Sequence, residues 1–155
     1  MKILLAIDDS RYSSDATEEV AARPWPAGTI VRVLSAVDIT PLAAEPVFIA
    51  NLDIDTMRDE IGRRYEKLMA RAADSLREKG LSAETVLRQG DPRSVIVDEA
   101  KEWDADLIVV GSHGYSGLKR WLLGSVAQSV VSHAPCSVEV VRKKGTHEEK
   151  GTHEG

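Results

Sequence analysis

Cysteine is almost absent from this chain of 155 residues, since Cys136 is the only one. One thiol cannot form an internal disulfide and has no partner cysteine for a metal site, and we interpret it as buried and inert. Apolar runs long enough to span a membrane are also absent, and Met1-Lys2 leads directly into a strand-like segment. We therefore expect no signal peptide, no membrane anchor and a cytoplasmic location.

An excess of positive charge is missing as well. The formal net charge is −5 at pH 7, which disfavours nonspecific binding of nucleic acid through the whole surface. Hydrophobic residues make up 43% and charged residues 29% of the chain, which are ordinary proportions for a globular protein. The length fits one domain with a core of its own.

Signatures of several nucleotide-processing enzymes are absent too. The chain contains no Gly-x-x-x-x-Gly-Lys-Ser/Thr, which excludes a P-loop NTPase. The turn after the first expected strand reads Asp8-Asp9-Ser10-Arg11, without the Ser-Gly-Gly-x-Asp-Ser loop of ATP pyrophosphatases, so adenylating chemistry has no support. No Ser/His/Asp set and no paired catalytic carboxylates can be assigned to a substrate pocket. These absences favour binding over fast catalysis.

Apolar strand-like runs alternate with segments that have a helical period. We expect strands at residues 3–7, 29–37, 81–87, 106–110 and 137–141, and helices starting near residues 13, 54, 92 and 125. The alternation predicts an α/β fold, with a single Rossmann-like domain in which a doubly wound sheet of five parallel strands carries helices on both faces. Ligands of such sheets lie beyond the carboxyl ends of the strands, at a switch point.

Short polar side chains mark the expected helix starts. Ser13 and Ser14 are candidate caps of the first helix, Asp53 or Asp55 of the second, and Asp91 of the third. These side chains accept hydrogen bonds from the unpaired N–H groups of a first helical turn.

Two segments have no regular pattern. Residues 38–53 contain two prolines and scattered apolar residues, and we interpret them as a long loop. Residues 143–155 repeat Lys-Gly-Thr-His-Glu and lack apolar side chains to bury, so we expect a disordered polar tail. The histidines and acids of this tail leave weak metal binding as the alternative.

The segment from Gly111 to Ser125 carries the main functional signal. An apolar run at 107–110 precedes it, glycines stand at positions 111, 114 and 124, and a helical pattern begins at Ser125. Glycines let a backbone approach an anion, and a helix start presents free N–H groups to it. We therefore predict a phosphate site. The alternatives are that Gly111 and Gly114 only make a turn and that Ser125 only caps its helix.

The stretch from Asp106 to Val141 resembles the C-terminal half of a universal stress protein of the ATP-binding type. The signature of that family is Gly, two residues, Gly, nine residues, then Gly-Ser or Gly-Thr. This chain matches each required position with Gly111, Gly114, Gly124 and Ser125. The resemblance covers nearly the whole ordered chain, and gives residues 1–142 as one universal stress protein domain.

The resemblance implies the strand order 3-2-1-4-5, which brings the ends of strands one and four to one crevice. The nucleotide-binding residues that it implies are Ala6, Ile7, Asp8, Ala36, Val37, Val110, Gly111, Ser112, His113, Gly114, Gly124, Ser125, Val126 and Ala127. Asp8 would contact the nucleotide and help to hold Mg²⁺ or Mn²⁺, or else serve as a helix cap or turn residue. His113 receives no acid–base role. Lys119 and Arg120 either screen phosphate charge or are solvated.

In function, the resemblance implies an ATP-binding stress-response protein that acts as a nucleotide-dependent switch or sensor. It also implies a homodimer through the last strand, Ser137–Val141, and protein partners that the sequence does not identify. The alternatives are slow ATP hydrolysis beside a metal at Asp8, binding of AMP or cyclic AMP in the same site, and an interaction module with an empty site. We assign no catalytic residue.

Overall fold

A computed structural model describes residues 1–40, 53–114 and 122–143. The predicted loop at 38–53 and the predicted tail therefore lie largely outside the described residues, as do Lys119 and Arg120. The elements in chain order are β1 (Lys2–Ala6), α1 (Arg11–Ala22), β2 (Ile30–Val37), α4 (Ile54–Glu78), β3 (Ser82–Gln89), α5 (Pro92–Trp103), β4 (Leu107–Gly111), α6 (Ser125–His133) and β5 (Ser137–Val141).

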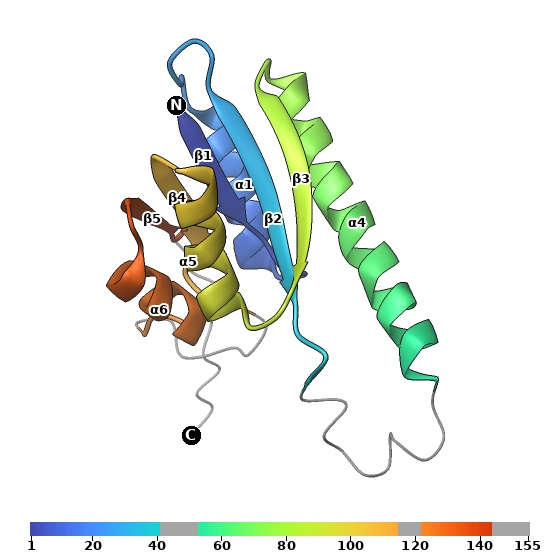
Figure 1. Ribbon diagram of the computed structural model, residues 1–155. Coiled ribbons are helices and arrows are strands. Elements are labelled where there is room, and N and C mark those ends of the chain that lie inside the picture. Colours follow the sequence, from blue (N-terminus) through green and yellow to red (C-terminus); the bar gives the residue numbers. More distant parts are fainter. Residues whose placement is uncertain (41–52, 115–121, 144–155) are drawn as a thin grey trace, which may run out of the picture.

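The five strands form one parallel sheet in the order β3-β2-β1-β4-β5 (Figure 1). This confirms the predicted fold class and strand order. β1 is the central strand, paired with β2 through Leu4↔Arg32 and with β4 through Leu4↔Ile108. The change of direction in the strand order falls between β1 and β4, so the sheet has its switch point there.

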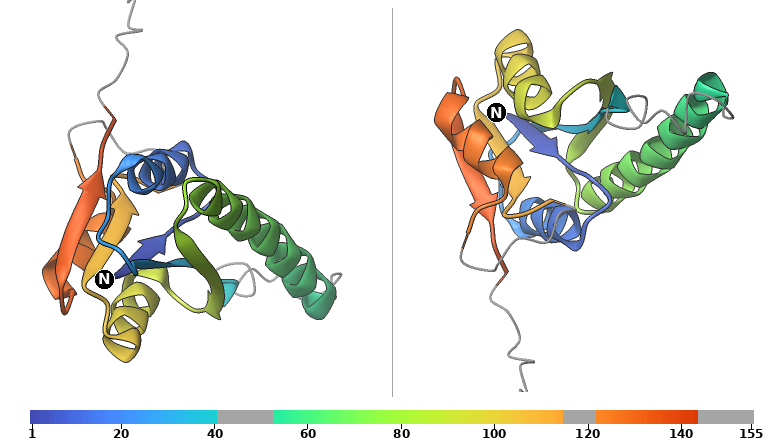
Figure 2. Two further views of the ribbon diagram at one scale, coloured as in Figure 1. Left: turned by 90° about the horizontal axis from the view of Figure 1, so that it is seen from above. Right: turned by 90° about the horizontal axis from the view of Figure 1, so that it is seen from below.

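Helices cover both faces of the sheet. Figure 2 shows α1 and α4 on one side and α5 and α6 on the other. Successive side chains of a strand point to opposite faces, and β1 therefore supplies two cores. Ile3 and Leu5 pack with α1 and α4, whereas Leu4 packs with α5 and α6, and all three are fully buried. The doubly wound arrangement explains why the strand reads as a continuous apolar run.

Helix starts were predicted with mixed success. Asp53 and Asp91 cap α4 and α5, with side-chain oxygens that accept backbone N–H groups of the first turn. The prediction for α1 was wrong, because Ser10 is its N-cap and the helix begins at Arg11. Ser13 lies inside the first turn, where its buried hydroxyl bonds to Asp8 instead of capping. Both ends of α6 and β5 lie where the sequence predicted.

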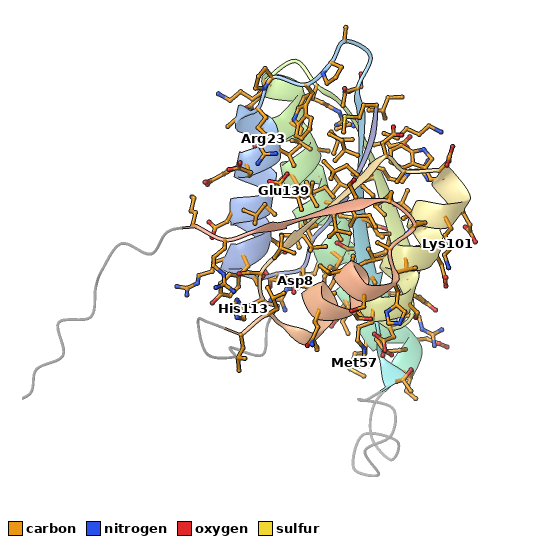
Figure 3. The ribbon with its side chains drawn as sticks, turned by 90° about the vertical axis from the view of Figure 1, so that its left-hand side faces the viewer. Asp8, Arg23, Met57, Lys101, His113 and Glu139 are labelled. Atoms are coloured by element: carbon orange, nitrogen blue, oxygen red, sulfur yellow. The ribbon has the colours of Figure 1, made fainter. Side chains whose placement is uncertain are left out.

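Strand β5 is one edge of the sheet. It pairs with β4 and contacts α1 and α6, and an ion pair connects it to α1. The guanidinium of Arg23 at the end of α1 donates to both carboxylate oxygens of Glu139 at 2.6 Å (Figure 3). Lys143, beyond the strand, contacts Asp15 of α1 at 3.3 Å. Among the described helices, none is both long and apolar enough to cross a membrane.

Candidate functional site

The carboxyl ends of β1 and β4 border a crevice on the face of the sheet that carries α5 and α6. Ten of the residues implied by the resemblance line it: Ala6, Ile7, Asp8, Ala36, Val110, Gly111, His113, Gly114, Val126 and Ala127. The volume of the crevice is about 70 Å³, well below the roughly 300–1,000 Å³ of small-molecule pockets. A ligand of nucleotide size would therefore fill it only in part and extend past its mouth.

Four further described residues, which sequence reasoning did not assign to the site, also line the crevice. They are Ser13, Leu34, Pro92 and Ile96. Leu34 precedes Ala36 by two positions on β2, so strand alternation places both on one face and was a usable signal. Pro92 and Ile96 are four apart on α5 and share a helical face, but only the packing of α5 shows that this face meets the crevice.

The other four implied residues stand around the crevice without lining it. Ser112 and Gly124 lie in the loop wall, where the Gly124 N–H donates to the Ser112 carbonyl at 2.8 Å. Ser125 is exposed at the first position of α6. Val37 lines a different hollow, together with Ile61 and Tyr65 of α4. Its side chain faces away because it alternates with Ala36 along β2.

The three signature glycines permit close contacts. None has a positive φ, so a left-handed turn does not require them. A Cβ at Gly111 would lie 2.8 Å from the backbone carbonyl of Tyr12, in the first turn of α1. At Gly124 it would lie 3.0 Å from the His113 Cα, and at Gly114 it would lie 3.1 Å from Asp8 Oδ2. At all three positions the missing side chain thus allows neighbouring segments to approach closely.

Asp8 is held by the start of α1. Its Oδ1 accepts the backbone N–H of Ser10 at 3.0 Å and the hydroxyl of Ser13 at 2.8 Å, while its own N–H donates to the Ser13 hydroxyl. Asp8 is therefore a turn residue, as one of the two interpretations held. Its Oδ2 lies toward Gly114 and accepts no hydrogen bond from another described residue. One carboxylate oxygen thus remains available to a ligand at the crevice.

The amino end of α6 differs from the other helix starts. Helices α1, α4 and α5 begin with side-chain caps, but Gly124 at the N-cap of α6 has no side chain to supply one. The first N–H groups of a helix have no partner within it, and they carry the positive end of the helix dipole. Val126 and Ala127 in this first turn line the crevice. An anion at the mouth of the crevice would meet these groups.

His113 is a buried titratable residue at this site. The residue is 7% exposed, its Nδ1 lies 2.9 Å from the Ser112 hydroxyl, and its ring centroid lies 5.0 Å from that of Tyr12. Its Nε2 is buried and has no hydrogen-bond partner within the part of the chain that the structure describes. Figure 3 shows His113 and Asp8 at the same end of the sheet.

Among the described residues, Asp8 is the carboxylate at the crevice that could contribute to a metal site. No group of three or more His, Cys, Asp or Glu residues that could bind a metal ion occurs in the ranges 1–40, 53–114 and 122–143. Asp8 therefore offers a single carboxylate. Mg²⁺ commonly binds through one or two carboxylates with substrate phosphates and water completing its shell, so Asp8 fits such an ion only when a phosphate ligand is present.

Comparison with known proteins shows that this chain, including every residue that lines the crevice, matches a known protein family. The model of the universal stress protein family matches residues 1–142. The universal stress protein YxiE of Bacillus subtilis is 37% identical over 145 residues, which cover 91% of this chain and 98% of that protein. The solved structure of the protein MJ0577 is similar with a TM-score of 0.81 and 26% identity, over 94% of this chain and 97% of that one.

More distant solved structures share the fold. One is a universal stress protein family protein from Arabidopsis thaliana with AMP bound, at 22% identity and a TM-score of 0.67, covering 94% of this chain and 93% of that one. Another is a universal stress protein in complex with cAMP, also at 22% identity, with a TM-score of 0.63, covering 92% of this chain and 96% of that one.

Proposed function

This chain belongs to the universal stress protein family, and we propose that it binds an adenine nucleotide, with ATP preferred, at the crevice between β1 and β4. The observation that carries the proposal is the uncapped start of α6 beside an apolar crevice at the switch point of the sheet. The AMP and cAMP bound by distant relatives support the nucleotide class.

Different residues of the crevice would contact the adenine ring, the phosphates and the ribose. Apolar side chains of Leu34, Ala36 and Ile96 offer a surface for the adenine ring. The N–H groups of the first turn of α6 receive a phosphate, because they lack a side-chain cap and lie at the positive end of the helix dipole. The free Oδ2 of Asp8 accepts a ribose hydroxyl, or binds a divalent cation that the phosphates share.

Binding is favoured over turnover in this proposal. Hydrolysis needs a group that positions or deprotonates water, and among the described residues that line the crevice Asp8 is the only carboxylate. A bound nucleotide would instead fix the spacing between α1, the β4 loop and α6, because it contacts all three. The chain then works as a nucleotide-dependent switch. We further propose that it forms a homodimer through β5, whose open edge needs covering.

The test is a pair of matched substitutions at two helix starts. Ser125→Asp places a carboxylate at the first turn of α6, where it stabilises the helix dipole but repels a phosphate. Ser94→Asp makes the same change in the first turn of α5, on the side of that helix away from Pro92 and Ile96. Both serines are exposed, so neither substitution disturbs the core.

Calorimetric titration of nucleotide-free protein with ATP, AMP and cyclic AMP measures the binding affinity of each variant. We expect Ser125→Asp to weaken ATP binding by at least about tenfold, the factor of one lost charge-assisted hydrogen bond. Ser94→Asp should bind as the unchanged protein does. The proposal fails when the unchanged protein binds none of the three nucleotides, or when the two variants bind ATP equally well.

A further inference from the structure

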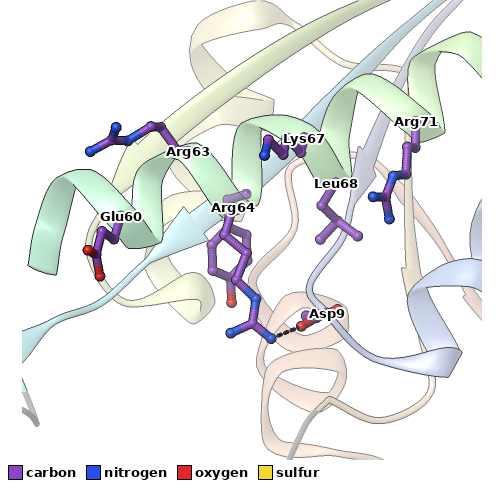
Figure 4. Close-up of a pocket in the computed structure, with 8 residues that line it drawn as sticks. Asp9, Glu60, Arg63, Arg64, Lys67, Leu68 and Arg71 are labelled. Atoms are coloured by element: carbon purple, nitrogen blue, oxygen red, sulfur yellow. Dashed lines mark hydrogen bonds and ion pairs between the residues drawn. The ribbon is translucent and has the colours of Figure 1, made fainter.

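A second, basic groove lies beside α4, on the face of the sheet opposite α5 and α6. It has a volume of about 570 Å³, and four cationic side chains line it: Arg63, Arg64, Lys67 and Arg71. The acidic residues in its wall are Asp9 and Glu60. Figure 4 shows Arg64 and Arg71 extending from α4 on the side of Asp9. None of these residues lines the nucleotide crevice.

The cations of the groove are only partly neutralised. Arg64 forms an ion pair with Asp9, and Arg63 donates to the carbonyl of Asp59. No ion pair joins Lys67 or Arg71 to another residue in the described part of the chain, and both are exposed. Arg64, Lys67 and Arg71 are spaced three and four residues apart, so they share one helix face and repel each other. An anion between them would remove this repulsion.

We propose that this groove binds a short oligophosphate, that is, a chain of linked phosphates either free or carried by a small molecule. Arginine forks donate pairs of hydrogen bonds to phosphate oxygens, and lysine adds a compact charge. Arg64 and Arg71 are seven residues apart, which is about 10 Å along the helix. That length suits a small anion. The net charge of −5 repels a longer polyanion such as nucleic acid outside the groove.

Occupation of the groove affects the neighbourhood of the crevice. An oligophosphate competes with Asp9 for Arg64, and Asp9 follows Asp8 directly in the chain. Arg71 and Asp8 also line one hollow between α1 and α4. The groove is therefore a separate site whose ligand changes the partner of a residue next to the nucleotide crevice.

Calorimetric titration with tripolyphosphate tests the proposal, in about 150 mM salt to screen weak surface attraction. The full chain is first saturated with AMP, which fills the crevice where it binds. The double variant Lys67→Gln/Arg71→Gln removes two groove charges. The matched control, Arg58→Gln/Lys79→Gln, removes two exposed charges of the same helix region that do not line the groove.

We expect the groove variant to bind tripolyphosphate at least about tenfold more weakly and the control to bind within about twofold of the unchanged protein. A loss of ATP binding in the groove variant that the control does not share would identify a nucleoside-linked chain as the source, because both variants keep the crevice that ATP also occupies. Four outcomes overturn the proposal: no binding, loss of binding on AMP saturation, equal weakening of both variants, or tighter binding of a single-stranded oligonucleotide. The comparison of the groove variant with the control does not depend on AMP binding, because neither variant changes a residue that lines the crevice.

Discussion

Replacing Gly111 by alanine should destabilise the whole fold, because the first turn of α1 fills the space beside it. The added Cβ would lie 2.8 Å from the backbone C and O atoms and from the Cβ of Tyr12. Backbone atoms cannot rotate away as a side-chain end can. The start of α1 is also fixed by the Ser10 cap and by the bonds between Ser13 and Asp8. Relief therefore requires α1 to move away from β4.

The expected loss follows from the cost of overpacking a filled interior. Inserting one methyl group where backbone must move lowers the free energy of unfolding by about 1–3 kcal/mol. For a chain of this length the melting temperature should fall by about 2–4 °C for each kcal/mol. Urea unfolding followed by circular dichroism measures the change, with an unchanged m-value showing that the two-state transition is kept.

Gly114→Ala is the matched control. The nearest atom to its added Cβ is Asp8 Oδ2 at 3.1 Å, which belongs to a side chain. We expect a loss below about 1 kcal/mol, together with an altered position of the carboxylate that we assign to the nucleotide. The reasoning is refuted when Gly111→Ala is as stable as the unchanged protein, or when Gly114→Ala is the more destabilised of the two.

Three further outcomes are expected. Hydrogen bonds from Arg93, first from its side chain and then from its backbone, lower the pKa of Asp91. The stability that Asp91 contributes is therefore fully present above its unfolded pKa and is lost as pH falls through its lower folded pKa. Asp91→Ala should cost about 0.5–2 kcal/mol at pH 7 and progressively less as the pH falls through the folded-state pKa of Asp91, and a constant cost in pH-dependent melting would contradict this. Burial raises the pKa of the Cys136 thiol, so disulfide-forming reagents should modify native protein more slowly than urea-unfolded protein, and equal rates would disprove it. Ser13→Ala removes two of the three hydrogen bonds that hold Asp8 and leaves the one from the Ser10 N–H. It should lower stability by about 1 kcal/mol and weaken ATP binding; calorimetry showing unchanged affinity would argue against a role for Asp8.

The sheet was predictable because each strand had a simple pattern. Buried runs such as Ile3–Ile7 and residues 107–110 have no polar residue to suggest a solvent face, which favours a sheet covered on both sides. The glycines at 111, 114 and 124 located the β4 side of the crevice. Their spacing does not reveal that Tyr12 packs against Gly111, since that contact joins residues 99 positions apart in the sequence.

Features that depend on packing were less predictable. Ser13 had the residue type and position of a cap, but Ser10 competes for the same N–H groups and starts the helix one turn earlier. Pro92 and Ile96 carried only the signals of a helix start and an apolar face. In the sequence, the basic groove is visible only as a run of charged residues. Recognising it as a groove requires the three-dimensional packing of α4 beside Asp9.

The ion pair between Arg23 and Glu139 has a consequence for aggregation. Glu139 is the central residue of an edge strand, and a charge at that position hinders unrelated chains from adding a strand to the open edge. In a two-fold pairing centred on this strand, two Glu139 carboxylates would come near each other. Each copy carries its own Arg23 at 2.6 Å to neutralise the repulsion. Folding of α1 against the sheet would thus allow self-pairing, while chains with α1 still undocked would repel each other.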